Sequence, residues 1–189
     1  MPLIEFMKKL INTKQRYGII TITFHWLMAI AIVGMFALGL WMVELDYYSE
    51  WYKFAPDTHR SIGILISITL FIRFIWRVFN ITPSPEPHLK KWEVKSAHSV
   101  HYLLYILTVI VIITGYLIST ADGRSVDVFG WFEVPATITT ITKQADRAGE
   151  LHYYIGIALI AISSIHALAA LKHHFINKDR TLLKMLGKK

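Results

Sequence analysis

The sequence contains no cysteine in its 189 residues. This absence excludes a disulfide framework, an iron–sulfur cluster held by cysteine thiolates, and covalent c-type haem attachment. Any prosthetic group must therefore be held by coordination and packing alone. Charged residues are also scarce, at 17% of the chain, and they are thinnest in four long apolar stretches.

The apolar residues, which make up 54% of the chain, gather in four runs of about 20 residues each. The runs cover about residues 19–42, 60–79, 99–119 and 150–171. A run of this length can cross the hydrocarbon core of a bilayer, and a helix satisfies its own backbone hydrogen bonds there. The sequence therefore predicts an all-α membrane protein, with residues 1–189 forming a single domain built as a bundle of four transmembrane helices.

Lysine and arginine are unevenly distributed among the segments that flank the runs. Fifteen of the 20 lie in the N-terminal segment, the second connection and the C-terminal tail, against five in the first and third connections. By the positive-inside rule, this asymmetry predicts that both termini are cytoplasmic. The net charge of +7 then reflects topology, and nucleic-acid binding is not expected. The basic, amphipathic segment from Met1 to Arg16 has no signal-peptide cleavage site and suits a helix on the inner membrane surface.

Four histidines lie in the predicted spans at matched depths. His25 and His166 are each about six residues from the inner end of a span, whereas His59 and His152 lie at outer ends. His152 and His166 are almost four helical turns apart, so they share one helix face, with about 21 Å between them along the axis. Two imidazoles on opposite faces of a haem give a six-coordinate iron suited to electron transfer. The depths predict two haems, with His25 and His166 as the inner axial pair and His59 and His152 as the outer pair.

A small residue follows each of these histidines at the fourth position: Ala29, Gly63, Gly156 and Ala170. A porphyrin that lies against a helix needs such a residue one turn from its ligand, because a large side chain would clash with the ring. The same offset from His98 and His101 reaches bulky tyrosines, which favours the four histidines above as ligands. Alanine and glycine are also common packing residues in membrane helices, so each small residue alone has an ordinary explanation.

Three arginines are candidates for contacts with haem propionates. Arg73 and Arg77 are four residues apart, on one face at the inner end of the second span. Snorkelling to lipid phosphate explains these two about equally well. Arg60 directly follows His59 at the outer end of the same span.

Three further histidines are candidates for positions around the cofactors. His98 and His101, at the start of the third span, suit places beside the haem, at a propionate or at a quinone site. His173 lies two turns after His166 on the same face. It could donate a hydrogen bond to a quinone carbonyl or pass a proton, and a surface histidine in a basic tail is the alternative.

Several short motifs extend over nearly the whole chain. They are Phe24-His25-Trp26-Leu27, His59-Arg60-Ser61-Ile62-Gly63, Ala97-His98 with His101, Leu151-His152, and His166-Ala167 followed by His173-His174-Phe175. Together they resemble the bacterial cytochrome b561 family of small dihaem membrane proteins. The resemblance implies two haem b groups, bound here by His25, His59, His152 and His166. It also implies electron exchange with ubiquinone, and one relative in the family passes electrons from periplasmic superoxide to quinone.

The expected function is transmembrane electron transfer in the bacterial inner membrane, between a quinone near the inner haem and a periplasmic redox partner. One alternative is a superoxide oxidase, that is, a superoxide:ubiquinone oxidoreductase, in which Arg60, Arg124 and Arg147 attract the anion. A second alternative is the haem-bearing membrane subunit of a larger dehydrogenase. A third is a histidine-lined metal transporter, against which the paired depths argue.

Overall fold

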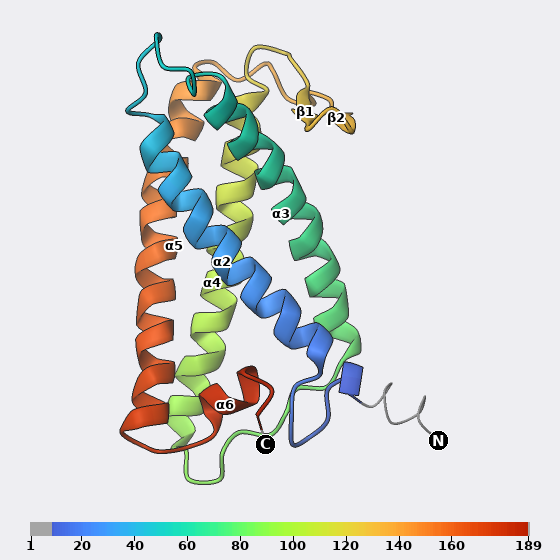
Figure 1. Ribbon diagram of the computed structural model, residues 1–189, viewed down its shortest axis with the longest axis vertical. Coiled ribbons are helices and arrows are strands. Elements are labelled where there is room, and N and C mark those ends of the chain that lie inside the picture. The colour runs from blue at the N-terminus through green and yellow to red at the C-terminus, as the bar shows by residue number, and fades with distance from the viewer. Residues whose placement is uncertain (1–8, 189) are drawn as a thin grey trace. The chain divides into compact units, whose positions relative to one another are not determined.

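The computed structural model describes residues 9–188. Its elements are α2 (Ile19–Met42), α3 (Phe54–Phe79), α4 (Lys91–Ser119), β1 (Val126–Val128), β2 (Phe132–Val134), α5 (Gln144–Phe175) and α6 (Thr181–Met185) (Figure 1). The helices α2, α3, α4 and α5 are long and apolar enough to cross a membrane. The predicted helical class with four candidate membrane spans is thus confirmed. Residues 1–8 of the N-terminal segment predicted to form a surface helix lie outside the described residues. In the other half, residues 9–10 are helical and residues 11–16 are not.

The start of a helix agrees with the start of its apolar run only where no polar helical turn comes before the run. Helix α2 covers the predicted residues, whereas α3, α4 and α5 begin earlier than the runs do. The early start of α4 has a local cause, because the Glu93 carboxylate accepts the Lys90 amide hydrogen at 3.0 Å. A glutamate that reaches back to the amide three residues earlier is one half of a capping box. Hydropathy therefore locates the membrane part of each helix and misses its water-exposed turns.

Exposed apolar side chains line the spans. Ile30, Phe71 and Leu168 expose 70%, 65% and 63% of their surface. Contiguous exposure on this scale is unfavourable in water and is normal for helices that face lipid.

The described chain forms two compact units, each containing part of every long helix. The terminal unit comprises residues 9–29, 69–103 and 162–188, and the hairpin unit comprises residues 30–68 and 104–161. The first and third connections therefore belong to the hairpin unit, and the second connection belongs to the terminal unit with the segments near both chain ends. The segments that are rich in lysine and arginine therefore belong to the terminal unit, and those that are poor in them belong to the hairpin unit.

In the terminal unit, the segment before α2 folds back on itself at Gly18. A Cβ atom at this position would lie 2.2 Å from the Leu10 carbonyl oxygen, so only glycine fits. The Asn12 side-chain oxygen accepts the Gly18 amide hydrogen at 2.8 Å and the Thr21 hydroxyl at 2.7 Å. These bonds fix the chain that leads into α2.

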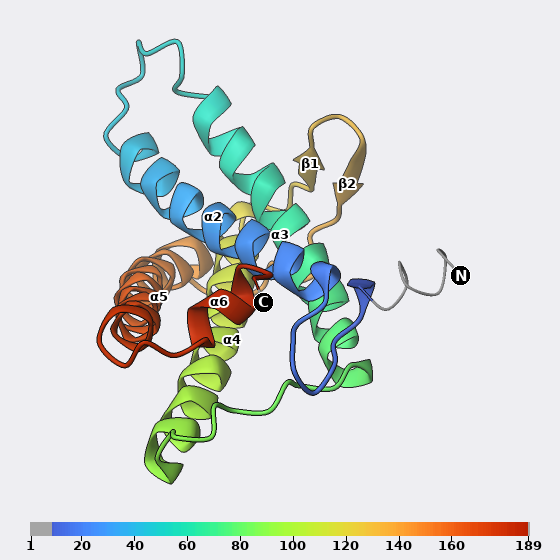
Figure 2. The same ribbon diagram turned by 60° about the horizontal axis from the view of Figure 1, so that its bottom comes forward.

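The C-terminal segment is tied to α2 in the same unit. The Trp26 indole donates a hydrogen bond of 2.9 Å to the carbonyl of Met185, the last residue of α6. Figure 2 shows α6 close to the C-terminus of the chain. Asp179 accepts the amide hydrogen of Thr181, the first residue of α6, at 2.8 Å. The N-cap position itself belongs to Arg180, one residue after Asp179.

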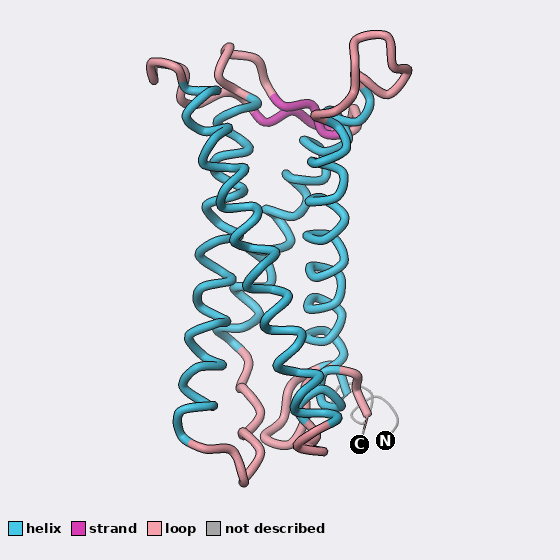
Figure 3. Tube along the Cα trace, turned by 90° about the vertical axis from the view of Figure 1, so that its left-hand side faces the viewer, coloured by secondary structure: helices cyan, strands magenta, loops and turns pink. Residues whose placement is uncertain are grey.

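In the hairpin unit, the third connection contains a short antiparallel hairpin that the sequence does not predict (Figure 3). Phe129 and Gly130 form its turn with φ angles of 52° and 71°, the backbone of a type I′ turn. The buried Ser61 hydroxyl of α3 donates to the Asp127 carbonyl at 3.1 Å and accepts the Phe129 amide hydrogen at 3.3 Å. The hairpin is therefore anchored to α3.

Candidate functional site

The terminal unit brings together one histidine from each of three helices. The rings of His25 (α2) and His166 (α5) have centres 6.3 Å apart, at an angle of 61°. His101 (α4) lies on His166 as well, with ring centres 5.1 Å apart at 64°. The first contact is the predicted inner pair, and the second places His101 beside it.

The hairpin unit contains the predicted outer pair. The rings of His59 (α3) and His152 (α5) also have centres 6.3 Å apart, at an angle of 69°. Both rings are half-buried. Each pair thus joins a histidine of α5 to a histidine of another helix within one unit.

The separation of 6.3 Å in both pairs fits two imidazoles that share one metal ion. A ligating imidazole nitrogen lies about 2.0–2.1 Å from its metal and about 1.1 Å from its own ring centre. Two rings on opposite sides of a metal therefore have centres about 6.3 Å apart. The 5.1 Å between His101 and His166 is too short for this geometry, so His101 is a neighbour of the pair.

Helix α4 fixes the orientation of the His152 ring. Its Nδ1 atom lies 3.0 Å from the Val111 carbonyl oxygen and 3.2 Å from the Thr114 hydroxyl. The carbonyl can only accept, so Nδ1 carries the hydrogen and Nε2 has the lone pair. Metal-bound histidines commonly donate their other nitrogen to a carbonyl in this way. No sequence pattern indicates this contact, because Val111 and Thr114 are ordinary residues of an apolar run.

Two glycines lie against the rings of the outer pair. A Cβ atom at Gly39 (α2) would lie 3.3 Å from His59 Cε1, and one at Gly115 (α4) would lie 3.1 Å from His152 Cε1. Sequence reasoning missed both glycines because it searched only the helix that carries each histidine. Within residues 9–188, no group forms a hydrogen bond with the buried Nδ1 atom of His59, and such an atom is accounted for when a group binds at the site.

Of the four small residues predicted to leave space for the porphyrin, the two glycines have room for a Cβ atom. A Cβ atom at Gly63 would meet Met35 at 3.9 Å, and one at Gly156 would meet Phe36 at 4.0 Å. Both distances are ordinary van der Waals contacts to the ends of side chains. Ala29 and Ala170 are half-buried on α2 and α5. Their role beside a haem stays a prediction.

The candidate arginines differ in their surroundings. Arg73 interacts electrostatically with both His25 and His166, which places its charge near the inner pair. Arg77 is half-buried one turn further along α3. Arg60 donates to the Asp57 carboxylate at 2.7 Å and to the Pro56 carbonyl at 3.2 Å, so a propionate would have to share it.

His173 is paired with a buried carboxylate. Its Nδ1 atom lies 2.7 Å from Asp179 Oδ2, and the Asp179 side chain is only 1% exposed. Burial opposes ionisation of Asp179, but the hydrogen bonds from Thr181 and His173 outweigh it and hold the pKa of the carboxyl below its usual value. His88, which had no predicted role, approaches the same oxygen at 3.4 Å.

His98 is exposed on α4. In the part of the chain that the structure describes, no hydrogen bond or ring contact joins it to either histidine pair. Its predicted place beside the cofactors stays a prediction.

The family described as prokaryotic cytochrome b561 matches residues 16–188. The chain belongs to that family. It is 52% identical over 177 residues to cytochrome b561 homolog 2 of Escherichia coli K12, covering 94% of each chain. It is also 30% identical to the probable superoxide oxidase CybB of Yersinia pestis, covering 93% of this chain and 98% of that one. Cytochrome b561 homolog 1 of Escherichia coli K12 is 29% identical, covering 92% and 98%.

Membership of the cytochrome b561 family confirms the resemblance found in the sequence motifs. With the four apolar helices, it makes this chain a multi-pass bacterial membrane protein of electron transport. The family implies b-type haem, and the two histidine pairs have the geometry to hold it.

Proposed function

We propose that this chain is a dihaem cytochrome b that carries electrons across the bacterial inner membrane between ubiquinone and a periplasmic redox partner. In this proposal His25 and His166 hold one haem, and His59 and His152 hold the other. Both chain termini are cytoplasmic in this proposal, so the first pair serves the quinone side and the second pair serves the periplasmic side.

The observation that carries the proposal is the equal ring separation of 6.3 Å in both pairs. When bound, haem b supplies a one-electron redox centre. The protein's own residues hold and tune that centre. His152 is oriented by Val111 and Thr114, and the charge of Arg73 lies near the inner pair, where it would offset the negative charge of a propionate.

His173 is the residue proposed to serve the quinone. Its pairing with the buried Asp179 fixes the ring, so Nδ1 faces the carboxylate and Nε2 faces away from it. When both nitrogens of a histidine held in this way are protonated, it can donate a hydrogen bond and a proton from Nε2. It lies two turns from His166 along α5, which supports a quinone site near the inner haem.

The test of the haem pairs is haem content after single substitutions. Purified protein should contain two haems per chain, and His59→Ala and His166→Ala should each contain one. His98→Ala is the matched control, because His98 is exposed, and it should keep both. If His101→Ala loses a haem while His25→Ala keeps two, the inner pairing is wrong.

The quinone role of His173 is tested separately by stopped-flow reduction with ubiquinol. His173→Leu should keep two haems and slow their reduction about tenfold or more, since positioned proton transfer contributes about 10²–10⁴-fold to rates. His174→Leu serves as the control from the adjacent position. Equal reduction rates in wild type and His173→Leu would place the quinone elsewhere.

A superoxide oxidase is the second candidate function, and the 30% identity to a probable superoxide oxidase favours it. Steering of an anionic radical needs a positive rim. In the hairpin unit, Arg60 is paired with Asp57 and Arg124 with Asp122, so two of the three candidate cations are offset. Haem reduction by superoxide pulses that is lost in an Arg60→Gln, Arg124→Gln and Arg147→Gln triple variant would establish this activity.

A further inference from the structure

The terminal unit contains a cavity of about 300 Å³ that the haem and quinone proposals do not use. Its walls come from two segments that are far apart in the sequence. Gln15, Arg16 and Tyr17 precede α2, and Arg180, Lys184 and Lys188 belong to the C-terminal segment. Four of these six residues are basic, and the two segments are held together by the bond between Trp26 and Met185.

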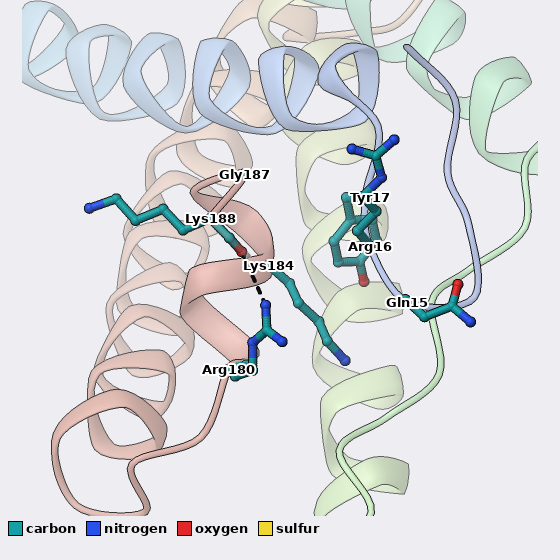
Figure 4. Close-up of a pocket in the computed structure, with 7 residues that line it drawn as sticks. All are labelled: Gln15, Arg16, Tyr17, Arg180, Lys184, Gly187 and Lys188. Atoms are coloured by element: carbon teal, nitrogen blue, oxygen red, sulfur yellow. Dashed lines mark hydrogen bonds between the residues drawn. The ribbon is translucent and has the colours of Figure 1, made fainter. Parts of the chain in front are cut away.

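The basic side chains do not all point into this cavity. Figure 4 shows the Arg180 guanidinium and the Lys184 side chain in the space between the two segments, whereas the Lys188 ammonium points away from it. Lys184 is bound to the Glu86 carboxylate at 2.7 Å and to the Ser84 carbonyl at 3.0 Å. Arg180 donates to the Lys188 carbonyl at a long 3.5 Å. A guanidinium has five N–H donors, so Arg180 is better able to bind a ligand than Lys184 or Lys188.

The Tyr17 hydroxyl is the neutral donor of the cavity, and Figure 4 shows it on the wall opposite Arg180. Burial raises the pKa of this hydroxyl, although the nearby Arg77 lowers it in part. The hydroxyl therefore keeps its proton at neutral pH and can donate it to an anion. A guanidinium and a hydroxyl on opposite walls suit a tetrahedral oxyanion.

The cavity lies where the apolar part of the chain begins. Tyr17 is two residues before Ile19, the first residue of α2, which is 50% exposed. Leu186, between two of the lining residues, is 44% exposed. A ligand with an anionic head and apolar chains would contact both the basic residues and these apolar side chains, whereas a soluble anion would use only the first.

We propose that this cavity binds the phosphate of an anionic phospholipid. Arg180 and Tyr17 donate hydrogen bonds to the phosphate, Lys184 stays paired with Glu86 at the edge of the site, and the acyl chains lie along Ile19 and Leu186. Basic pockets at the cytoplasmic ends of membrane helices are suited to anionic headgroups. The site would hold the N-terminal and C-terminal segments together at the membrane surface.

The test is lipid titration of the haem-loaded protein in detergent, with binding counted by native mass spectrometry. Phosphatidylglycerol should bind at least about tenfold more tightly than phosphatidylcholine. Arg180→Gln should weaken phosphatidylglycerol binding about tenfold, the equivalent of one charged hydrogen bond, and Tyr17→Phe should weaken it about threefold. Lys188→Gln is the matched control, and it should bind within a factor of two of wild type.

The remaining outcomes each decide the proposal. Equal losses in Arg180→Gln and Lys188→Gln would mean diffuse surface attraction and would overturn it. Competition by millimolar inorganic phosphate as strong as that by the lipid would assign a soluble anion instead. An unchanged haem spectrum shows that a variant is folded, and if Arg180→Gln fails this check, Tyr17→Phe decides the question. The measurement does not involve electron transfer, so a negative result would leave the proposed function intact.

Discussion

His152 Nδ1 lies 3.0 Å from the carbonyl oxygen of Val111, which joins the imidazole on α5 to the backbone of α4. Such a carbonyl normally accepts only the amide four residues later in its own helix. Here it also accepts from a side chain, and the residue four positions later is Gly115. The ring therefore rests on the α4 backbone, where any side chain at position 115 would meet it.

This contact predicts the effect of Gly115→Ala. The added Cβ atom would lie 3.1 Å from His152 Cε1 and 3.4 Å from Nδ1, so the ring must move by a few tenths of an ångström and its bond to Val111 must lengthen. We expect the outer haem to bind about 10–100-fold less tightly, the usual effect of disturbing a partner of a metal ligand. Haem content during dilution or competition with apomyoglobin measures this loss.

Gly34→Ala is the control for that experiment, because a Cβ atom at Gly34 meets no described residue within 4 Å. It should retain both haems as the wild type does. Unchanged retention in Gly115→Ala would show that the His152 ring tolerates displacement and is not fixed by α4.

Thr114 predicts a change in redox potential. Its hydroxyl oxygen lies 3.2 Å from His152 Nδ1. The hydroxyl oxygen and the Val111 carbonyl oxygen both accept the hydrogen on Nδ1. Loss of an acceptor makes the imidazole a weaker donor to the iron, which stabilises the oxidised state less. Thr114→Val should raise the midpoint potential of one haem by tens of millivolts, where about 59 mV corresponds to a tenfold change in equilibrium. Thr114→Ser should restore the wild-type value in a spectroelectrochemical titration, and a fall in potential would contradict the assignment.

The sequence predicted the features that depend on position along a single helix. The four spans follow from run length, and the two histidine pairs follow from depth, because depth in a membrane is nearly a function of residue number. The ring of His25 lies beside that of His166, and the ring of His59 lies beside that of His152, as the matched depths predict. Haem ligation by these pairs stays a prediction.

The features that the sequence did not predict depend on which helix faces touch. Gly39 lies against His59, and Gly115 lies against His152, but neither contact has a signature in its own run. His88, in the proline-rich linker, approaches Asp179 through a fold of the chain that joins residues 91 positions apart. The turn of the hairpin was missed because Phe129 has a positive φ, a conformation for which phenylalanine gives no signal.

The Ser61 hydroxyl predicts how the hairpin is held. Ser61 is 2% exposed and bonds both Asp127 and Phe129, so Ser61→Ala leaves the Asp127 carbonyl and the Phe129 amide with one bond fewer. Each lost hydrogen bond costs about 0.5–1.5 kcal/mol. Amide hydrogen exchange in residues 126–134 should accelerate about tenfold or more, with haem content unchanged. Ser99→Ala, at an exposed position of α4, should leave exchange in the hairpin as it is in the wild type.

Asp179 predicts a pH-dependent contribution to stability. Its pKa in the folded protein is held below the usual value, because the bonds from Thr181 and His173 outweigh the effect of burial. A carboxyl group with a lowered folded-state pKa stabilises the fold above its unfolded pKa of about 3.9, and the stabilisation is lost as the pH falls through the lowered value.

The variant Asp179→Asn removes this charge while keeping the shape of the side chain. At pH 7 it should unfold at a lower temperature than the wild type, by the equivalent of about 1–3 kcal/mol, since a buried hydrogen-bonded charge is lost. The difference should shrink as the pH falls below about 4. It should vanish only below the lowered pKa of Asp179, where the wild-type carboxyl is neutral as well. Glu50→Gln, at an exposed position of the first connection, should follow the wild type at every pH. Thermal unfolding followed by circular dichroism measures all three, and a difference between Asp179→Asn and wild type that persists undiminished below the lowered pKa would assign the effect to packing instead of charge.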